Sequence, residues 1–497
     1  METPPAKSAS PRGNRGRSRL TRRRFAAGVA LGAAGSAALG AGLIVARGGR
    51  VTAQDAATPV AAPGRFIEPG VRLSMNGLLD TTLSAAPDAT DGPGRMTYDG
   101  ELPGPTLRFR PGDTLKLRLQ NDLGGDITNL HVHGLHVSPR DNGDNVFVHV
   151  MSGESFSYEC QIPDNHPAGL FWYHPHSHGD SMQQVAGGLA GAMIIEGGLD
   201  NLPEIQGIPE RLMVLQGPFF GTAGIQYLVN GQVNPEIAIR PGQTQRWRIL
   251  NASANNFFNL QLAGYPFHRI AIDGNPLPAP LTIDLILLGP GERADVLIQG
   301  GAPGSYELRS LAWGERGQAQ PDFLVATVTV AGEAETPAPL PTTLLPLAPP
   351  YIDLSSVPID RQRIITFEEA SDAPYFSIDG KAFDADRVDQ TVNLGATEEW
   401  IIRSNNPDWH PFHIHVNDFQ VMSINGEPQP AHYEDTTPVP GNGEVVIRTR
   451  FLDFTGKFVY HCHILGHEDA GMMGVVEVVE GANGATPIAF PAATPGT

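Results

Sequence analysis

The chain has 497 residues and a net charge of −19, and it contains 57 Gly and 44 Pro. This length exceeds what one hydrophobic core supports and indicates about three domains of ordinary size. The many glycines and prolines favour short strands and turns over long helices. The acidic charge disfavours binding to nucleic acid or to anionic membranes.

Residues 1–53 have the features of an export signal. The run Arg22-Arg23-Arg24 precedes an apolar stretch rich in Ala and Gly at 26–46, and Val51-Thr52-Ala53 resembles a small-residue cleavage site. This pattern predicts a twin-arginine signal peptide and a mature protein in the periplasm, on the cell surface or outside the cell. An uncleaved membrane anchor is the alternative, because the apolar stretch is almost long enough to span a bilayer. After cleavage we expect no stable insertion into a membrane.

An internal repeat follows the leader. Each copy begins with an Asp-Gly or Asn-Gly pair, continues through a glycine turn into a strand-like segment and ends at an asparagine. The three copies run from Asp99 to Asn121, from Asn230 to Asn251 and from Asp379 to Asn405. Histidines follow copies one and three, whereas the segment after copy two reads Asn259-Leu260-Gln261. The middle domain is therefore predicted to bind no metal.

The repeat also predicts the fold. Alternation of period two within these segments, with Gly and Pro at the turns, is typical of Greek-key β-sandwiches, so we expect an all-β chain of three sandwich domains. A proline-rich stretch between the second and third domains predicts a semi-rigid linker. The predicted segments are domain one at 60–198, domain two at 199–334, the linker at 335–350 and domain three at 351–482.

Three clusters contain histidines spaced by one residue. They are His131-Val132-His133, His174-Pro175-His176-Ser177-His178 and His410-Pro411-Phe412-His413-Ile414-His415. In an extended backbone, residues i and i+2 point to the same side, so each cluster can present two rings to one metal site. Imidazole suits copper, zinc, iron and nickel alike, and the histidines alone do not select the metal.

A fourth cluster places a cysteine between two histidines. It reads His461-Cys462-His463, and His467 and Met472 follow five and ten residues after the cysteine. Cysteine, histidine and a weak axial methionine form the ligand set of a blue-copper centre. Because side chains of a strand alternate, His461 and His463 would point away from Cys462 and toward other ions. We therefore expect copper.

The four motifs, in this order, resemble those of three-domain multicopper oxidases, the family of laccases and bacterial copper-efflux oxidases, over about residues 65–480. The resemblance implies cupredoxin-like domains and about four copper ions, one of type 1, one of type 2 and two of type 3. The implied type 1 ligands are His410, Cys462, His467 and axial Met472. The implied type 2 ligands are His131 and His413. The implied type 3 ligands are His133, His174, His176, His415, His461 and His463.

Two acids resemble the carboxylates that serve oxygen reduction in bacterial members of the family. Glu468 directly follows His467 and would relay protons, and its alternative role is that of a solvated carboxylate beside the site. Asp144 would orient water at the type 2 copper, with Asp141 as a competitor in the same loop. His178 extends the second cluster, but the family pattern leaves it no ligand position.

The resemblance implies an oxidoreductase with O2 as acceptor, in which Cys462 lies on the electron path from the type 1 copper to the trinuclear cluster. Copper-efflux oxidases usually carry a methionine-rich insert near the blue site, and the ten methionines of this chain form none. We therefore expect a laccase-like monomer that oxidises diphenols, other phenols and aromatic amines. The alternative is a metallo-oxidase for cuprous, ferrous or manganous ions. The complete ligand set argues against a copper-free scaffold protein of the cell envelope.

Overall fold

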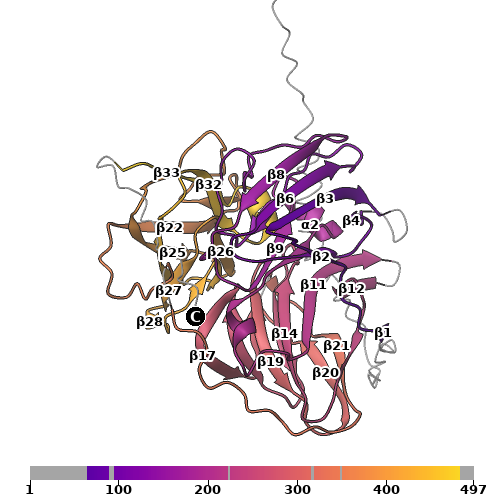
Figure 1. Cartoon of the computed structure of the whole chain (residues 1–497). Coiled ribbons are helices and arrows are strands. Elements are labelled where there is room, and N and C mark those ends of the chain that lie inside the picture. The colour runs from indigo at the N-terminus through magenta and orange to yellow at the C-terminus, as the bar shows by residue number, and fades with distance from the viewer. Residues whose placement is uncertain (1–63, 89–93, 222–223, 315–317, 348–349, 482–497) are drawn as a thin grey trace, which may run out of the picture. The chain divides into compact units, whose positions relative to one another are not determined.

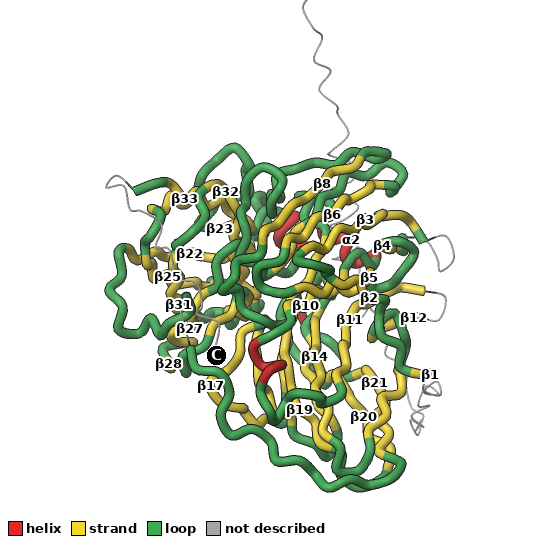
Figure 2. The backbone as a smooth tube through the Cα atoms, viewed as in Figure 1, coloured by secondary structure: helices red, strands yellow, loops and turns green. Residues whose placement is uncertain are grey.

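The computed structural model describes residues 64–88, 94–221, 224–314, 318–347 and 350–481. Strands dominate this part of the chain (Figure 1), which confirms the all-β class. Its helical segments are short (Figure 2) and comprise α2 (Ser181–Gly187), the 3-10 segment η1 (Gly198–Asn201) and α3 (Leu465–Asp469). None of the helices in these residues is long and apolar enough to cross a membrane. The predicted export signal lies outside the described residues.

The first sandwich consists of two sheets. One sheet contains, in spatial order, β4 (Met96–Tyr98), β3 (Leu78–Pro87), β6 (Thr114–Asn121) and β8 (Ser155–Gln161). The other contains β2 (Val71–Leu73), β5 (Gly104–Phe109), β10 (Gly191–Ile195), β9 (Leu170–His174) and β7 (His131–His133). Leu117 and Tyr158 of one sheet share a buried core with Phe109 and Tyr173 of the other, so the two sheets pack face to face.

The middle sandwich has the same layout. One sheet contains β12 (Gly224–Val229), β11 (Glu210–Gly221), β14 (Thr244–Asn251), β19 (Arg293–Gln299), β16 (Phe267–Ile272) and β17 (Asn275–Ile283). The other contains β1 (Gly64–Arg65), β13 (Pro235–Ile239), β21 (Phe323–Val330), β20 (Gly304–Ser310), β15 (Phe258–Leu262) and β18 (Ile286–Leu288). Their shared core includes Ile249 and Val296 from one sheet and Leu260 and Val328 from the other.

The third sandwich completes the fold. One sheet contains β23 (Phe376–Ile378), β22 (Arg361–Glu369), β25 (Thr397–Ser404), β31 (Glu444–Arg450), β27 (Phe419–Ile424) and β28 (Glu427–Pro428), with β29 (Tyr433–Glu434) beside β27. The other contains β24 (Gln390–Asn393), β33 (Met473–Val479), β32 (Gly456–Cys462), β26 (His410–Ile414) and β30 (Thr436–Val439). Trp400 and Ile447 of one sheet share a core with Phe412 and Val476 of the other.

The predicted repeat recurs as the same turn in each sandwich. Asp99, Asn230 and Asp379 have φ of 55°, 52° and 52°, and the glycine after each has φ of 76°, 75° and 72°. Two successive positive φ values are typical of type I′ turns, which Asp-Gly and Asn-Gly pairs favour. The strands that follow these turns along the repeat, β6, β14 and β25, occupy corresponding places in the three sandwiches.

Apolar contacts join neighbouring sandwiches. Leu170 of the first packs with Val214 of the middle one, and Val146 of the first packs with Val459 of the third. The described residues of the predicted linker contain no helix or strand, and its Leu344 is buried in a small cluster with residues of the middle sandwich. At the other end, β1 precedes the first sandwich in sequence but pairs with β13 of the middle one.

Strand pairing brings the histidine clusters into register. β7 pairs with β9 and places His131 opposite His174. β26 pairs with β32 and places His413 opposite His461, and Phe412 opposite Cys462. The first pair lies in the first sandwich and the second pair in the third sandwich. Each pair of neighbouring strands therefore brings two of the four histidine motifs side by side.

Candidate metal centre

Eight histidines from the four motifs lie buried together where the first and third sandwiches meet. Each of these eight residues is at most 2% exposed. They come from β7, from the end of β9 and the loop after it, and from the ends of β26 and β32. They are His131, His133, His174, His176, His413, His415, His461 and His463.

The ring nitrogens of these residues face one another. His131 Nε2 lies 3.4 Å from His413 Nε2. His133 Nδ1 lies 3.2 Å from His463 Nε2, and His174 forms a group with these two rings. These groups combine residues of the first and third sandwiches.

Another group consists of His176, His415 and His461. Nε2 of His176 lies 3.1 Å from Nε2 of His415 and 3.1 Å from Nε2 of His461, and the last two atoms are 3.3 Å apart. His176 comes from the first sandwich and the other two from the third. The three rings therefore enclose a small space with nitrogen atoms on its sides.

Hydrogen bonds behind the rings determine which nitrogen faces inward. His413 Nδ1 donates to the Asp435 carbonyl oxygen at 2.7 Å, and His131 Nδ1 contacts the Asp144 carboxylate at 2.9 Å. A neutral imidazole has one N–H, so the two Nε2 atoms carry lone pairs where they meet. Facing lone pairs repel each other unless a cation binds both, and this arrangement therefore fits a metal ion.

His174 and His461 follow the same rule. Each donates from Nδ1 to the carbonyl oxygen of the next residue, at 2.9 and 3.0 Å. The lone pair of His461 Nε2 then faces His176 and His415. His174 Nε2 is buried and has no hydrogen-bond partner among the described residues. A buried acceptor of this kind is costly to leave without a partner, and a metal ion would provide one.

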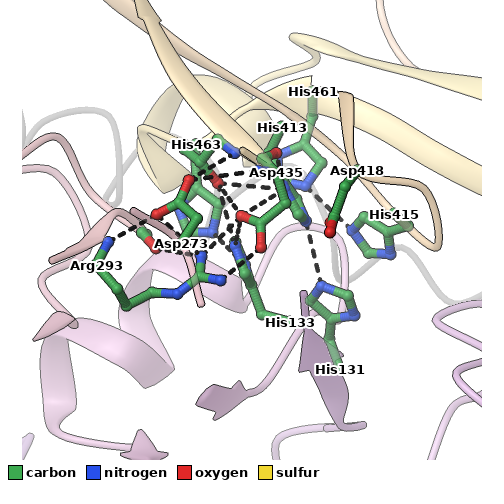
Figure 3. Close-up of polar contacts among 12 residues, drawn as sticks. His131, His133, Asp273, Arg293, His413, His415, Asp418, Asp435, His461 and His463 are labelled. Carbon is green, nitrogen blue, oxygen red and sulfur yellow. Dashed lines mark hydrogen bonds and ion pairs between the residues drawn. The ribbon is translucent and has the colours of Figure 1, made fainter. Parts of the chain in front are cut away.

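His133 has the opposite orientation. Its Nε2 lies 3.0 Å from Asp435 Oδ1 and 3.1 Å from Thr436 Oγ1, so Nδ1 faces inward. Figure 3 shows this ring beside Asp435 and close to His413. Asp435 therefore determines the tautomer of His133.

Burial keeps these histidines neutral. It lowers the pKa of His413 to about 4 and the pKa of the other seven well below the ordinary value of histidine, and neighbouring histidines lower the pKa of those seven as well. The neutral imidazole is the form that binds metal ions. The electrostatics of the cluster therefore agree with the lone-pair geometry.

Cys462 forms a separate group with two other histidines. Its Sγ lies 3.5 Å from His410 Nδ1 and 3.9 Å from His467 Nδ1, and these two nitrogens are 3.3 Å apart. The backbone N–H of Ile464 donates to Sγ at 3.4 Å. One sulfur and two imidazole nitrogens form a donor set that suits copper.

Met472 lies on the Cys462 side of the third sandwich. It is fully buried in the core that contains Cys462, and its carbonyl oxygen accepts from the Cys462 backbone N–H at 3.1 Å. Met473 begins β33 and packs instead in a cluster with Val146 and Val459. The packing therefore favours Met472 over Met473 as a further donor beside the Cys-His-His group.

Both predicted acids contact the histidine cluster. Asp144 is 2% exposed, contacts His131 Nδ1 and accepts from the Val132 backbone N–H at 3.0 Å. Glu468 on α3 is fully buried, and its Oε2 lies 3.2 Å from His461 Nδ1. Asp141, the alternative to Asp144, is exposed in the turn.

His178 lies outside the metal-binding groups. It is exposed, and its ring lies 4.7 Å from the Phe383 ring. His136 and His166 contact each other through the His136 backbone N–H, which donates to His166 Nε2 at 2.9 Å. His432 contacts Glu434 at 2.6 Å. The contacts named here involve no residue of the metal-binding groups.

Three residues near the site carry no signal in the sequence motifs. Asp435 and Arg293 form an ion pair behind His133. Glu369 lies at the end of β22, and its Oε1 is 3.5 Å from His410 Nε2. Burial, together with the nearby charge of Asp408, raises the pKa of Glu369 to about 7. Long-range folding brings these residues to the histidines, and no local pattern in the sequence predicts it.

Sequence comparisons agree with this architecture. Three family models, each described as multicopper oxidase, match residues 84–199, 165–332 and 356–482. A multicopper oxidase of Staphylococcus haemolyticus is 30% identical over 408 residues, which cover 77% of this chain and 83% of the relative. A cell division protein FtsP of Xenorhabdus nematophila is 32% identical over 413 residues, which cover 76% and 84%.

Solved structures share the fold. A multicopper oxidase from Campylobacter jejuni, described as a metallo-oxidase, has a TM-score of 0.72 at 28% identity and covers 84% of this chain and 96% of its own. A laccase from Pediococcus acidilactici has a TM-score of 0.71 at 28% identity and covers 84% and 94%. With its three cupredoxin-like sandwiches and its copper-type donor groups, this chain belongs to the multicopper oxidase family.

Proposed function

We propose that this protein is a laccase-like oxidase that takes single electrons from phenols or aromatic amines and reduces O2 to water. The observation that carries the proposal is the set of facing ring-nitrogen lone pairs beside a separate Cys-His-His group. Bound copper, about four ions per chain, would supply one-electron transfer at Cys462 and oxygen reduction among the eight histidines.

The proposed ligand sets follow the groups in the structure. His410, Cys462, His467 and Met472 would hold the type 1 copper. His131 and His413 would hold the type 2 copper. His133, His174 and His463 would hold one type 3 copper, and His176, His415 and His461 would hold the other.

The backbone around Cys462 links the two regions. Its neighbours His461 and His463 belong to two different histidine groups, and the sulfur belongs to the Cys-His-His group. Electrons that enter at the sulfur therefore have a short covalent route to both groups.

Buried carboxylates serve the oxygen side. We assign Glu468 as the proton relay because its Oε2 lies 3.2 Å from His461 Nδ1 and its side chain is closed to solvent. A carboxyl group can hold a proton at that oxygen and pass it on without free access of water. We assign to Asp144 the orientation of His131 and of water near it, because its carboxylate contacts the ring nitrogen that faces away from the cluster.

The reductant would arrive at His467. Its side chain is 17% exposed, whereas His410 and Cys462 are fully buried. The Phe376 ring stacks on the His467 ring with centroids 4.4 Å apart. An aromatic reductant would therefore meet an aromatic surface directly beside a ligand, which favours phenols and aromatic amines over metal ions.

A metallo-oxidase is the second candidate, because Glu369 lies beside His410 and is 24% exposed. A carboxylate at this place could hold a cuprous, ferrous or manganous ion as the substrate. The relative from Campylobacter jejuni is described as a metallo-oxidase. The relatives also include a cell division protein FtsP. A copper-free scaffold role in the cell envelope is disfavoured by the complete donor set.

The location and the oligomeric state of the mature protein are proposed from the sequence. We propose export by the twin-arginine route to the periplasm, the cell surface or the outside of the cell, and a monomeric mature protein that binds no nucleic acid. The acidic composition supports the absence of nucleic-acid binding, because a net charge of −19 repels polyanions.

Oxygen-uptake assays of the copper-loaded protein with a phenol, cuprous ion, ferrous ion and manganous ion test the substrate class. We expect the highest kcat/KM with the phenol. A higher kcat/KM with any of the metal ions would favour the metallo-oxidase, and a protein that binds no copper would refute the oxidase altogether.

A further inference from the structure

Asp435 lies between β29 and β30 and contacts two different histidine groups. Its Oδ1 lies 3.0 Å from His133 Nε2, and its carbonyl oxygen accepts from His413 Nδ1 at 2.7 Å. Because each contact occupies the outward nitrogen of a ring, the inward nitrogen keeps its lone pair. One residue thus orients a proposed type 3 ligand and a proposed type 2 ligand.

Arg293 of the middle sandwich holds this aspartate. Its Nη1 donates to Asp435 Oδ1 at 2.7 Å, and its Nη2 donates to Asp435 Oδ2 at 2.5 Å. Nε donates to the carbonyl oxygen of Leu170 in the first sandwich at 3.1 Å. Figure 3 shows Arg293 beside Asp435. The arginine is 1% exposed, and it also donates to the carbonyl oxygen of Gly291 in its own loop at 3.1 Å. Its hydrogen bonds therefore reach all three sandwiches.

The surroundings fit this ion pair closely. Asp273 Oδ1 accepts from the Arg293 backbone N–H at 2.8 Å, and Asp273 Oδ2 accepts from the Thr436 backbone N–H at 3.1 Å. Gly134, which follows His133, has φ of 84°, and a Cβ there would lie against Asp435 Oδ2 and 2.8 Å from Arg293 Nη2. The glycine of the first histidine motif therefore leaves room for the pair.

We propose that Arg293 is a positioning residue for the oxygen-reducing copper cluster, and that the copper-free middle sandwich acts on the cluster through Arg293 and Asp435. This inference rests on the proposed function, because it assigns His133 and His413 as copper ligands. The middle sandwich then does more than separate the other two.

The fork of the guanidinium explains why arginine is needed. Two parallel hydrogen bonds fix the plane of the Asp435 carboxylate, and a lysine offers a point charge without that fork. With a lysine the carboxylate can rotate, and His133 can place its N–H on Nδ1, where a lone pair is required. Loss of a hydrogen-bond partner behind a metal ligand typically lowers metal affinity about 10- to 100-fold.

Arg293→Lys tests the inference, with Arg248→Lys as the matched control. Arg248 is also a fully buried arginine of the middle sandwich, and its hydrogen bonds go to Asp200, Glu210 and Asp295. Both variants and the parent protein are loaded with copper and dialysed against a graded series of copper chelator. Copper content, the blue absorption of the Cys462 centre and the electron paramagnetic resonance spectrum of the type 2 copper are then measured.

We expect Arg293→Lys to lose copper from the histidine cluster at about 10- to 100-fold lower chelator concentration than the parent protein. Its type 2 spectrum should change, and its blue absorption should remain. Arg248→Lys should match the parent protein in all three measurements. The inference is overturned if Arg293→Lys retains copper and the type 2 spectrum of the parent protein.

Asp435→Asn decides the question if Arg293→Lys does not fold. The amide keeps the shape of the carboxylate but cannot accept from both nitrogens of the fork and from His133. We expect the same loss of cluster copper with the blue absorption retained, and parent-like copper retention would overturn the inference. A parent protein that binds no copper would refute the proposed function instead, so the two failures are distinguishable.

Discussion

Ring orientation at single residues determines what the candidate centre can bind. His413 and His461 turn Nε2 inward because Nδ1 donates to a backbone carbonyl oxygen, whereas His133 turns Nδ1 inward because Asp435 accepts from Nε2. Protonation of such a ring would replace the inward lone pair by an N–H. The hydrogen bonds behind the ligands are therefore as important as the ligands themselves.

Met472 should tune the blue centre. Met472→Leu is expected to keep the blue absorption and to raise the reduction potential, because a weak axial donor that stabilises oxidised copper is removed. Met473→Leu is the matched control and should leave the potential unchanged, since Met473 packs in a different cluster. Redox titration of the blue band gives the potential. A shift in Met473→Leu without a shift in Met472→Leu would reverse the assignment.

Glu468 should limit the oxygen half of the reaction. Glu468→Gln is expected to slow reoxidation by O2 by about 10²- to 10⁴-fold, because the amide keeps the shape but cannot carry the proton. Stopped-flow mixing with a phenol in air should then show accumulation of reduced enzyme. Reduction of the blue centre should proceed at the parent rate. Slower reduction with unchanged reoxidation would place this acid on the substrate side.

Asp144 should act on the same half of the reaction. Asp144→Asn is expected to slow reoxidation about 10- to 100-fold, because the His131 contact is weakened. Asp141→Asn is its matched control, since Asp141 lies exposed in the same loop. The same stopped-flow measurement compares them. Equal effects of the two substitutions would contradict the role of Asp144.

At the scale of elements, three of the histidines follow the end of a strand rather than lying inside it. β9 ends at His174, β26 at Ile414 and β32 at Cys462, so His176, His415 and His463 lie just beyond a strand. The chain can turn there, and the second ring of a motif reaches a different group from the first. His415 precedes Val416, which has a φ of 69°. Strict alternation along a strand therefore explains only part of the geometry.

His176 and His178 test this segment directly. His176→Ala should weaken copper binding at the cluster by more than the roughly 10- to 100-fold typical of losing a partner behind a ligand, because it removes one of three facing nitrogens. His178→Ala removes a ring of the same type two residues away, and it should leave copper content unchanged because His178 is exposed against Phe383. Copper content after dialysis against chelator is measured. Copper loss in His178→Ala would contradict the assignment of His178 as a residue that binds no copper.

The sequence predicts what local patterns encode. The spacing of histidines, the Cys462 motif and the Asp-Gly and Asn-Gly pairs are all local, and the structure places the histidines of these motifs in buried groups. Arg293 and Asp435 are 142 residues apart, and Asp435 is 302 residues from His133. No periodicity relates such positions. The hydrogen-bond partners behind the histidines are therefore brought into place only when the three sandwiches pack together.

At the scale of the whole molecule, the candidate metal centre connects the first and third sandwiches. His131 and His413 are 282 residues apart and come from the first and third sandwiches. A ligand that binds the folded state and not the unfolded chain stabilises the fold by mass action. Copper should therefore hold together parts of the chain that are distant in sequence.

Copper removal should lower the stability of the protein. At free copper about 1,000 times the dissociation constant, one site adds about 4 kcal/mol to the free energy of unfolding. We expect the apo protein to have a lower Tm than the copper-loaded protein, and reconstitution to restore it. Calorimetry of both forms, at matched protein concentration, provides the comparison. Equal Tm values would show that the centre does not link the sandwiches.

The most direct test of the central claim is the copper content of the reconstituted protein together with its blue absorption. The account predicts about four copper ions per chain and a strong thiolate-to-copper band. Cys462→Ser should abolish the band and the oxidase activity, while the eight buried histidines keep the remaining copper ions. A fully loaded parent protein without blue colour, or a Cys462→Ser variant that keeps the colour, would contradict the account.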